Sequence, residues 1–455
     1  MDRPNCIVLF VVDCLRADHL SCYGYPRATS PEIDQLARQG VRFESCYPQG
    51  FYTFASHVSM LSSVPQSMHR LQNGETLKYD FRMIPDYLRD AGYATAGFVS
   101  NGILAGDFGF QDHFEHYDDG LSPSSGVDET YSRSSAETAE HVVSWIEKEG
   151  AGNTFLFIHL NDCHAPYTPP EPYRSMFIAD DMPRTGKTLP IQRGFRNVIR
   201  PECAVEGRSD VDFYISQYDG ALRQVSSSIK QITDCLARFA PRDETLLILT
   251  GDHGEGLGEH DYYFMHGTAF YEEFIRVPLI VAGPGIPVGS VVSPPARHID
   301  LLPTVLDLIG ANSRPDYIQG QSLLPLLAGN APVQARDLFE LGRNSAYVRN
   351  GDWKYIRTRD HALIPPKQGI PELKRQIKQH FLRPIEEIYN LKDDPTESRN
   401  LLRAEPERAR NFRRQLDQYV AASTSTDLDQ WVLANAPVVG EAQVNERLRA
   451  LGYIE

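Results

Sequence analysis

Short apolar runs, each bounded by turns, alternate with helical patterns along most of this chain. The runs at residues 6–12, 93–100, 154–160, 245–250 and 277–282 each have the length of one buried strand. The segments between them carry the start and stop signals of capped helices. This alternation predicts an α/β fold with a mostly parallel central sheet and helices on both faces.

The predicted helices begin and end at recognisable residues. In residues 30–40, Ser30 is a candidate cap, Pro31 stands in the first turn and Gly40 marks the exit. Segments 83–92 and 300–310 have the same pattern. These signals favour helices that connect consecutive strands.

The pattern changes after about residue 340. The next segment alternates like an exposed hairpin with its turn at Asn350 and Gly351. We therefore expect a larger α/β domain over residues 1–340 and a smaller C-terminal α+β subdomain over 341–455, with a small antiparallel sheet and helices. Within the larger domain, the Pro- and Arg-rich segment 168–210 is expected to be a lid or specificity element.

Composition excludes several classes of partner. The formal net charge of −15 has the wrong sign for non-specific binding to nucleic acid or to an anionic membrane. No stretch approaches the roughly 20 apolar residues that a membrane span needs. The first apolar run ends in Asp13 and has no small-residue cleavage site, so we interpret it as a strand and not as a signal peptide. With 7 cysteines and no paired metal spacing, the sequence predicts a cytoplasmic protein with reduced thiols.

Carboxylates and imidazoles follow three of the predicted strands: they are Asp13, Asp162, His164, Asp252, His253 and, farther on, His266. Ligands of open parallel sheets bind beyond the carboxyl ends of the strands, so these side chains are expected at one rim. A single aspartate after a strand is more often a turn residue or a helix cap. Several carboxylates together would repel one another, and a bound divalent cation is the natural compensation.

Several stretches resemble the sulfatase family of the alkaline phosphatase superfamily. They include "VVDCLRADHLSCYGYPRATSPEIDQLARQGVRFESCY", "TFASHVSMLSSV", "HLNDCHAPYTPP" and "LILTGDHGEGLGEH". The segments "DWKYIR", "EEIYNLKDDPTESRNL" and "LRALGY" are similar to the carboxy-terminal part of that family. The likeness follows the family order over nearly the whole chain. It implies the alkaline phosphatase-like fold, with residues 1–340 as the catalytic domain, and hydrolysis of sulfate, phosphate or phosphonate esters.

The resemblance also implies a nucleophile. Sulfatases carry a formylglycine, made from Cys or Ser, at the head of a Cys-x-Pro-Ser-Arg motif that opens a helix. Here Thr53 stands at that position and His57 stands at the arginine. Because Thr is not a substrate for this conversion, no formylglycine is expected, and Thr53 itself would attack as an alkoxide. Ser56 is expected to cap the helix, and Cys46, in "CYPQG", is a weaker alternative for the modified residue.

The family's metal ligands fall on Asp13, Asp252 and His253, and Thr53 would complete the set. A second aspartate common in the family is Val12 here, which resembles the branch that contains phosphonate monoester and phosphodiester hydrolases. Two carboxylates, an imidazole and a hydroxyl fit Mn²⁺, Mg²⁺ or Zn²⁺ somewhat better than Ca²⁺. The sequence does not choose among these four metals.

The substrate side departs from the family pattern. His164 matches the family's substrate-contacting histidine, His266 stands at its catalytic lysine, and the segment around Asn101 replaces a Gly-Lys-Trp-His motif. One interpretation is that His57, His164 and His266 hydrogen-bond the ester oxygens. The other is a second metal or substrate site formed by Asp162, His164, His266 and Asn101. Both interpretations remain open at the level of sequence.

Three functions fit these residues. The first is a metal-dependent hydrolase of a small-molecule, glycan or lipid-headgroup ester, with Thr53 as nucleophile. The second is a transferase that passes the group from Thr53 to an alcohol, with segment 168–210 supplying the acceptor site. The third is a non-catalytic binding protein that has lost its cationic anchors. The sequence leaves a homo-oligomer open.

Overall fold

The computed structural model describes residues 3–77, 81–121, 132–178, 185–189, 203–311, 314–329, 337–342, 345–359 and 385–425. Parts of the expected lid at 168–210 and the closing "LRALGY" motif lie outside these residues. The remaining sequence predictions can be compared with the structure.

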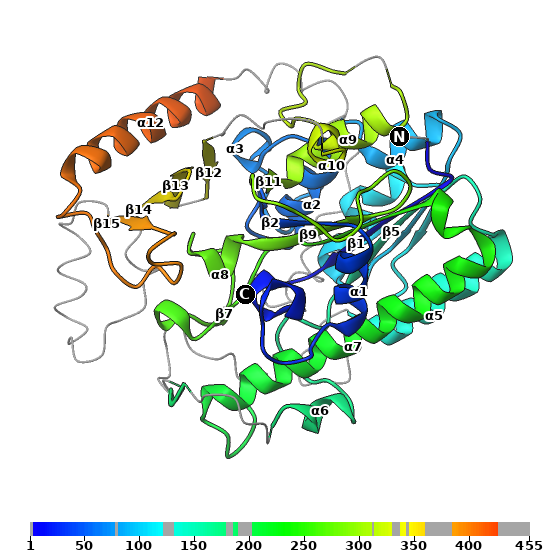
Figure 1. Ribbon diagram of the computed structural model, residues 1–455, viewed down its shortest axis with the longest axis horizontal. Helices are drawn as coiled ribbons and strands as arrows, with labels where there is room; N and C mark the ends of the chain where they lie inside the picture. The colour runs from blue at the N-terminus through cyan, green and yellow to red at the C-terminus, as the bar shows by residue number, and fades with distance from the viewer. Residues whose placement is uncertain are drawn as a thin grey trace.

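A mixed sheet forms the centre of the molecule, and all five predicted strands belong to it (Figure 1). Its order is β10-β2-β9-β6-β1-β5-β3-β4, with β11 beside β2. The strands are β1 (Cys6–Val12), β2 (Val41–Tyr47), β3 (Ala94–Phe98), β4 (His116–Asp118), β5 (Thr154–Leu160), β6 (Thr245–Gly251), β9 (Val277–Ala282), β10 (Ser290–Val292) and β11 (Ala296–Arg297).

Among the described strands of this sheet, β9 alone runs against its neighbours. It pairs antiparallel with both β6 and β2, while the other pairs in the sheet are parallel. The reason is its connection to β6. The chain leaves β6 at Gly251 and re-enters the sheet at Val277 at the same edge, with Thr250 opposite Leu279. The prediction of a mostly parallel sheet is confirmed, and β9 is its exception.

Helices cover both faces of the sheet. One face carries α1 (Pro31–Gln39), α5 (Ser135–Glu149) and α7 (Val211–Phe239); the other carries α2 (Thr53–Ser62), α4 (Ile84–Asp90) and α9 (Leu301–Leu308). Alternate residues of β1 enter the two cores: Ile7, Leu9 and Val11 pack with α2, α4 and α9, and Val8 and Phe10 pack with α1, α5 and α7. Both faces of β1 are therefore buried, as its continuous apolar run predicts.

Shorter elements complete the main body. They are α3 (Gln66–His69), α6 (Tyr173–Met176), α8 (Glu272–Ile275), α10 (Leu324–Leu327), and the 3-10 helices η1 (Ala17–His19), η2 (Ser21–Tyr23), η3 (Gly102–Leu104), η4 (Gly106–Phe108), η5 (Phe110–His113), η7 (Arg242–Glu244), η8 (Glu259–Asp261) and η9 (His298–Asp300). Helix α1 starts after Ser30 as predicted, but the Ser30 hydroxyl donates to Asp34 Oδ1 at 2.9 Å and caps no helix N–H.

A second, antiparallel sheet follows the main body. It consists of β12 (Leu338–Leu341), β13 (Ser345–Asn350), β14 (Trp353–Thr358) and β15 (Ile385–Asn390), and α12 (Pro406–Ser425) packs on it (Figure 1). The hairpin is present, but its turn lies one residue later than predicted, at Gly351 and Asp352, because Asn350 pairs with Trp353, with Gly351 at φ 56°. Its strands are mostly buried and not exposed as predicted.

The second sheet is held between two apolar clusters. Val348 and Tyr355 pack against Phe412 of α12, while Tyr347 and Ile356 face the main body. Lys354 also links the two parts: it is fully buried, and its Nζ lies 2.9 Å from Glu272 Oε1 of α8 and 2.8 Å from Glu397 Oε1. The C-terminal part is thus anchored through both apolar packing and a buried ion cluster.

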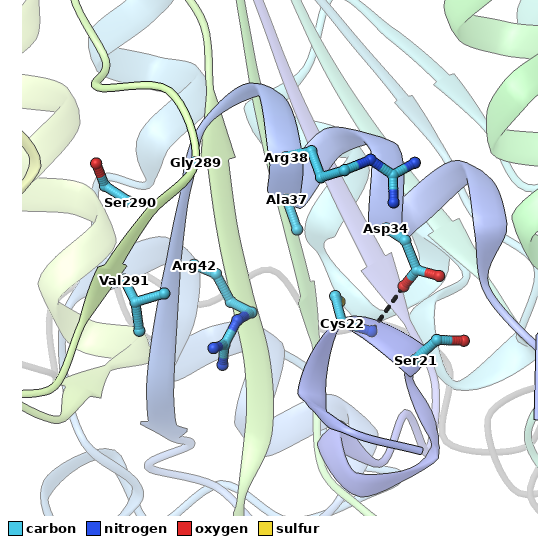
Figure 2. A pocket seen from close by; sticks show the side chains of 9 residues that line it. All are labelled: Ser21, Cys22, Asp34, Ala37, Arg38, Arg42, Gly289, Ser290 and Val291. Carbon is cyan, nitrogen blue, oxygen red and sulfur yellow. Dashed lines mark hydrogen bonds between the residues drawn. The ribbon is translucent and has the colours of Figure 1, made fainter. Parts of the chain in front are cut away.

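A surface pocket opens beside the first residues of β2 (Figure 2). Asp34 of α1 reaches the loop of Cys22 and accepts its backbone N–H at 2.9 Å, and Ser290 and Val291 of β10 form the other side. The side chains that follow the strands are not among its lining residues.

Among the helices in the described part of the chain, none combines the length and apolar character needed to cross a bilayer.

Candidate active site

The parallel register brings the predicted site residues together. Val12, the last residue of β1, pairs with Leu160 of β5 on one side and with Gly251 of β6 on the other. The residues that follow these three strands therefore emerge side by side at one rim. Asp13 follows β1, Asp252 and His253 follow β6, and Thr53 is the first residue of α2.

Four donor atoms converge at this rim. His253 Nε2 lies 3.4 Å from Thr53 Oγ1, 3.4 Å from Asp252 Oδ2 and 3.8 Å from Asp13 Oδ1. Atoms that share a cation at bond lengths of about 2.0–2.2 Å are separated by roughly 3.0–3.6 Å. All four side chains are at most 1 % exposed. Their spacing and burial fit a metal site.

The hydrogen bonds around these atoms support the same conclusion. His253 Nδ1 lies 3.1 Å from the carbonyl oxygen of Gly254, to which it donates, so Nε2 faces the site as a lone pair. Asp13 Oδ1 and Asp252 Oδ2 are buried without any hydrogen-bond partner. Facing lone pairs in a buried site repel unless a proton or a cation lies between them. The donor set therefore fits a divalent cation.

The charges of the two carboxylates show the same conflict. Burial opposes ionisation of Asp13, but the imidazoles of His159, His164 and His253 hold the pKa of its carboxyl well below the ordinary value. Burial and the negative charge of Asp13 raise the pKa of the Asp252 carboxyl well above its ordinary value. A bound cation would let both carboxylates ionise together.

The remaining oxygens of both carboxylates are held in place. Asp252 Oδ1 accepts the backbone N–H groups of Cys14 at 3.0 Å and of His253 at 2.8 Å. Asp13 Oδ2 accepts from Asn101 Nδ2 at 3.0 Å, and His159 Nε2 lies 3.5 Å from it. Asn101, predicted as part of the site, is therefore a support of Asp13. The sequence interpretation missed His159, whose only signal is a lone imidazole within the apolar run of β5.

His57 lies directly behind Thr53. Its Nδ1 donates to the Thr53 carbonyl oxygen at 2.6 Å, one turn earlier in α2. Burial and the neighbouring imidazole of His159 lower the pKa of His57 well below the ordinary value, so the ring is neutral with its proton at Nδ1. Its Nε2 is buried and has no hydrogen-bond partner. The structure thus brings His57 into the site and couples it to the backbone of Thr53.

Two expectations about the neighbouring residues change. Ser56 does not cap α2, because the helix begins earlier, at Thr53; its hydroxyl instead donates to the Asp252 carbonyl oxygen at 2.7 Å. Ser56 thereby ties α2 to the end of β6. Cys46 lies within β2 and is fully buried in the apolar core, so it is not at the position where α2 opens.

His164 and His266 lie next to each other, and His266 also contacts the ring of His253. A short antiparallel pair, β7 (Gly256–Leu257) and β8 (Tyr263–Met265), turns the chain back after Asp252, so that His266 stacks on His253 with ring centroids 4.3 Å apart. The centroids of His164 and His266 are 5.1 Å apart. His164 Nδ1 donates to the Ala165 carbonyl at 2.6 Å, and its Nε2 has no hydrogen-bond partner.

Asp162 has a different environment. Its Oδ2 accepts the backbone N–H of Ser135, the first residue of α5, at 2.7 Å. Burial raises the pKa of this carboxyl to about 6. Among the described residues, the groups of metal-binding side chains with donor atoms within 4.8 Å of one another do not include Asp162. The carboxylate of Asp162 thus stabilises the start of a helix.

Comparison with known families agrees with this geometry. The family model described as Sulfatase matches residues 5–311, which include every residue discussed for the site. This chain belongs to the sulfatase family. A second model, N-sulphoglucosamine sulphohydrolase, C-terminal, matches residues 258–424. The predictions of a sulfatase-like hydrolase and of an alkaline phosphatase-like fold are confirmed at this level, and members of the family are metal-dependent.

Individual relatives are distant. The multifunctional alkaline phosphatase superfamily protein PehA of Trinickia caryophylli is 27 % identical over 416 residues, covering 74 % of this chain and 79 % of that protein. N-acetylglucosamine-6-O-sulfatase of Bacteroides thetaiotaomicron is 24 % identical over 489 residues, covering 88 % and 82 %.

Two solved structures share the fold of this sulfatase-family chain. The structure of BT4656 with its substrate D-glucosamine-2-N,6-O-disulfate has a TM-score of 0.73 and 19 % identity, covering 94 % of this chain and 99 % of that chain. The phosphonate monoester hydrolase of Agrobacterium radiobacter has a TM-score of 0.69 and 20 % identity, covering 92 % and 96 %.

Proposed function

We propose that this sulfatase-family hydrolase cleaves phosphate or phosphonate esters, with Thr53 as the nucleophile. The observation that supports this proposal is the position of Thr53 Oγ1, 3.4 Å from His253 Nε2 and at the first residue of α2. The hydroxyl thus stands beside the unpartnered carboxylate oxygens of Asp13 and Asp252, which lie 3.8 and 3.4 Å from the same His253 Nε2.

The chemistry of a threonyl ester favours phosphorus over sulfur. In the first step, a bond forms between Thr53 Oγ1 and phosphorus, the ester P–O bond breaks, and the proton lost by the Thr53 hydroxyl is passed on to the leaving oxygen. In the second step, water attacks phosphorus, the Oγ1–P bond breaks, and a proton from that water restores the Thr53 hydroxyl. A formylglycine hydrate can release sulfate by collapsing to an aldehyde, and a threonine cannot. The fold shared with a phosphonate monoester hydrolase is consistent with this choice.

Asp13, Thr53, Asp252 and His253 would hold a divalent cation. When bound, such a cation lowers the pKa of a hydroxyl that it contacts and neutralises charge on the ester oxygens. The imidazole in the set favours Zn²⁺ over Ca²⁺, and the two carboxylates also suit Mn²⁺ or Mg²⁺. The protein itself fixes the donors, through the N–H groups that hold Asp252 Oδ1 and the Asn101 side chain that holds Asp13 Oδ2.

The histidines divide into two roles in this proposal. His57 orients the nucleophile, because its Nδ1 donates to the Thr53 carbonyl at 2.6 Å. His164 and His266, on the other side of His253, face the ester oxygens and the leaving group. The unpartnered Nε2 of His164 is suited to exchanging a proton with the leaving oxygen.

Three broader expectations remain proposals. We retain the division into residues 1–340 and 341–455, supported by the separate antiparallel sheet. A cytoplasmic location is supported by the seven cysteines, which form no disulfide in the described part of the chain. The ester belongs to a small molecule, glycan or lipid headgroup, and one of the relatives is named an N-acetylglucosamine-6-O-sulfatase.

A panel of esters tests the proposed reaction. Wild type, Thr53→Ala and Thr53→Ser would be assayed with Mn²⁺ on an aryl sulfate, a phosphomonoester, a phosphodiester and a phosphonate monoester. We expect the phosphorus esters to turn over, a loss of at least about 10³-fold in Thr53→Ala, and partial retention in Thr53→Ser. Turnover of the aryl sulfate alone, or full activity in Thr53→Ala, would refute the proposal. Products formed in the presence of added alcohols separate transfer from hydrolysis.

A further inference from the structure

The chain turns directly after β1, at the point where it presents Asp13. Cys14, the next residue, has a left-handed backbone with φ 58° and is fully buried. A residue with a Cβ seldom adopts this conformation, because the Cβ then lies too close to a backbone carbonyl oxygen, so neighbouring groups must hold it. The backbone N–H of Cys14 donates to Asp252 Oδ1 at 3.0 Å. The position of Cys14 therefore affects both carboxylates of the proposed metal site.

Tyr218 of α7 holds the same turn from the other side. Its hydroxyl donates to the Cys14 carbonyl oxygen at 2.8 Å and accepts the backbone N–H of Arg16 at 3.0 Å. One hydroxyl thus bridges the two backbone groups on either side of Leu15. All four residues are at most 3 % exposed, so water cannot replace the hydroxyl freely. Without it, a buried carbonyl and a buried N–H would each lose a hydrogen bond.

The ring of Tyr218 contacts two of the loops that carry site residues. It packs edge-on against His19, with ring centroids 5.0 Å apart, and against Tyr167, with centroids 5.6 Å apart. His19 belongs to η1, in the loop after β1, and Tyr167 lies three residues after His164, in the loop after β5. The loops that follow two neighbouring strands therefore pack on one side chain of α7.

The next residue of α7 fixes the rest of the loop after β1. Asp219 is fully buried, and its Oδ1 lies 2.7 Å from His19 Nδ1. Its Oδ2 accepts from the Tyr25 hydroxyl at 2.7 Å and from Arg27 Nη1 at 2.6 Å. Three side chains of the loop are thereby bound to the helix that carries Tyr218. These bonds keep the loop against α7, so the Tyr218 hydroxyl stays opposite the turn.

We propose that Tyr218 is a positioning residue of the active site: its hydroxyl holds the turn at Cys14 and thereby directs the carboxylates of Asp13 and Asp252 toward their shared cation. It acts through the backbone, because both hydrogen bonds of the hydroxyl go to main-chain atoms. Metal ligands that are less firmly held bind the metal more weakly. The inference rests on the metal ligands of the proposed function, but not on Thr53 as the nucleophile or on the type of ester.

Tyr218→Phe tests this role, because it removes the hydroxyl and keeps the ring. The chelator-treated full-length protein would be titrated with Mn²⁺ in equilibrium dialysis, and its unfolding in urea would be measured in parallel. We expect the Mn²⁺ dissociation constant to rise at least about tenfold. Tyr214→Phe is the matched control, one turn earlier on α7: its hydroxyl accepts the Val205 N–H at 2.9 Å and donates to the Arg208 carbonyl at 3.2 Å. Both variants should lower the urea midpoint, but Tyr214→Phe should keep wild-type Mn²⁺ affinity.

Hydrogen exchange of the wild type provides a measurement that needs no substitution. The backbone N–H of Arg16 is bound by the Tyr218 hydroxyl, and that of Val205 is bound by the Tyr214 hydroxyl. If opening of the turn at Cys14 disrupts the metal site, saturating Mn²⁺ must make this opening rarer by linkage. We therefore expect Mn²⁺ to slow exchange of the Arg16 N–H at least about tenfold and to leave the rate at Val205 unchanged.

The outcomes separate this role from the proposed reaction. Wild-type Mn²⁺ affinity in Tyr218→Phe, equal losses of affinity in Tyr218→Phe and Tyr214→Phe, or an Arg16 exchange rate independent of Mn²⁺ would overturn the inference even if esters are hydrolysed. A wild type that binds no Mn²⁺ would overturn both the inference and the proposed metal ligands. Mn²⁺ binding that depends on Tyr218 would support the inference even if no ester is turned over.

Discussion

The hydroxyl of Thr53 lies 3.4 Å from Nε2 of His253, although 200 positions separate the two residues in sequence. Each side chain is held by a different element, Thr53 by the first turn of α2 and His253 by the end of β6. Ser56 fixes the distance between these elements, because its hydroxyl donates to the Asp252 carbonyl at 2.7 Å. The separation of Thr53 and His253 is therefore set by how α2 packs against the sheet.

Asp252→Asn tests the proposed metal site with a side chain of nearly the same shape. The variant loses the negative charge at Oδ2, so we expect the dissociation constant for Mn²⁺ to rise at least about 100-fold in equilibrium dialysis. Asp162→Asn is the control: its carboxyl binds Ser135 N of α5, and Mn²⁺ affinity should not change. Equal Mn²⁺ affinity in wild type and Asp252→Asn would contradict the assigned ligand set.

Asn101→Ala tests how Asp13 is positioned. Asn101 Nδ2 donates to Asp13 Oδ2 and to Asn161 Oδ1, both at 3.0 Å. Without this support, we expect Mn²⁺ affinity to fall about 10- to 100-fold while the protein remains folded. Asn390→Ala, which removes an exposed contact to Asp393 far from the site, should leave the affinity as in wild type. A drop in thermal stability alone, with unchanged Mn²⁺ binding, would show that Asn101 is only structural.

Lys354→Ala tests the anchor of the second sheet. The substitution leaves Glu272 and Glu397 without their buried partner, and we expect the free energy of unfolding in urea to fall by about 3–5 kcal/mol. Lys148→Ala, at an exposed pair with Glu149, should leave the urea midpoint unchanged. A Lys354→Ala midpoint equal to that of wild type would mean that apolar packing alone holds the sheet.

His260 makes stability depend on pH. Burial disfavours its charged form, but the carboxylate of Glu273, 2.7 Å away, raises the pKa of His260 to about 9. Because this pKa is higher in the folded than in the unfolded protein, the charged His260 contributes its full stabilisation below the unfolded value of about 6.5. That contribution is lost as the pH rises through about 9. The difference in unfolding free energy between wild type and His260→Gln should therefore be larger at pH 6 than at pH 10. A difference independent of pH would disprove this linkage.

The sequence predicted five of the nine strands of the central sheet, those that are largely buried on both faces, and missed the short or partly exposed β2, β4, β10 and β11. The apolar runs of β1, β5 and β9 coincide with the observed strands at Cys6–Val12, Thr154–Leu160 and Val277–Ala282. The direction of β9 could not be predicted in this way, because direction depends on the path of the connection and not on the composition of the strand. Register, which brings Val12 beside Leu160 and Gly251, also depends on tertiary packing.

The sequence also predicted which side chains gather at this rim, but not their partners. Asp13 and Asp162 both follow buried strands, and only the structure shows that one faces the rim while the other binds the start of α5. His159 was missed because an imidazole within an apolar strand usually belongs to the core. Cys14, whose Sγ lies 3.5 Å from His266 Nδ1, was missed because this proximity depends on the turn between β7 and β8.

The reversed direction of β9 has a consequence for how this enzyme family can diversify. Because the chain leaves β6 and enters β9 at the same end of the sheet, the connection that carries His253, Glu255 and His266 is fixed at both of its ends by neighbouring strands. Residues inserted between Gly258 and Tyr262 would lengthen the tip of that connection without shifting Asp252. Substrate selectivity would then change at the tip of the connection, while the side chains next to Asp252 keep their positions.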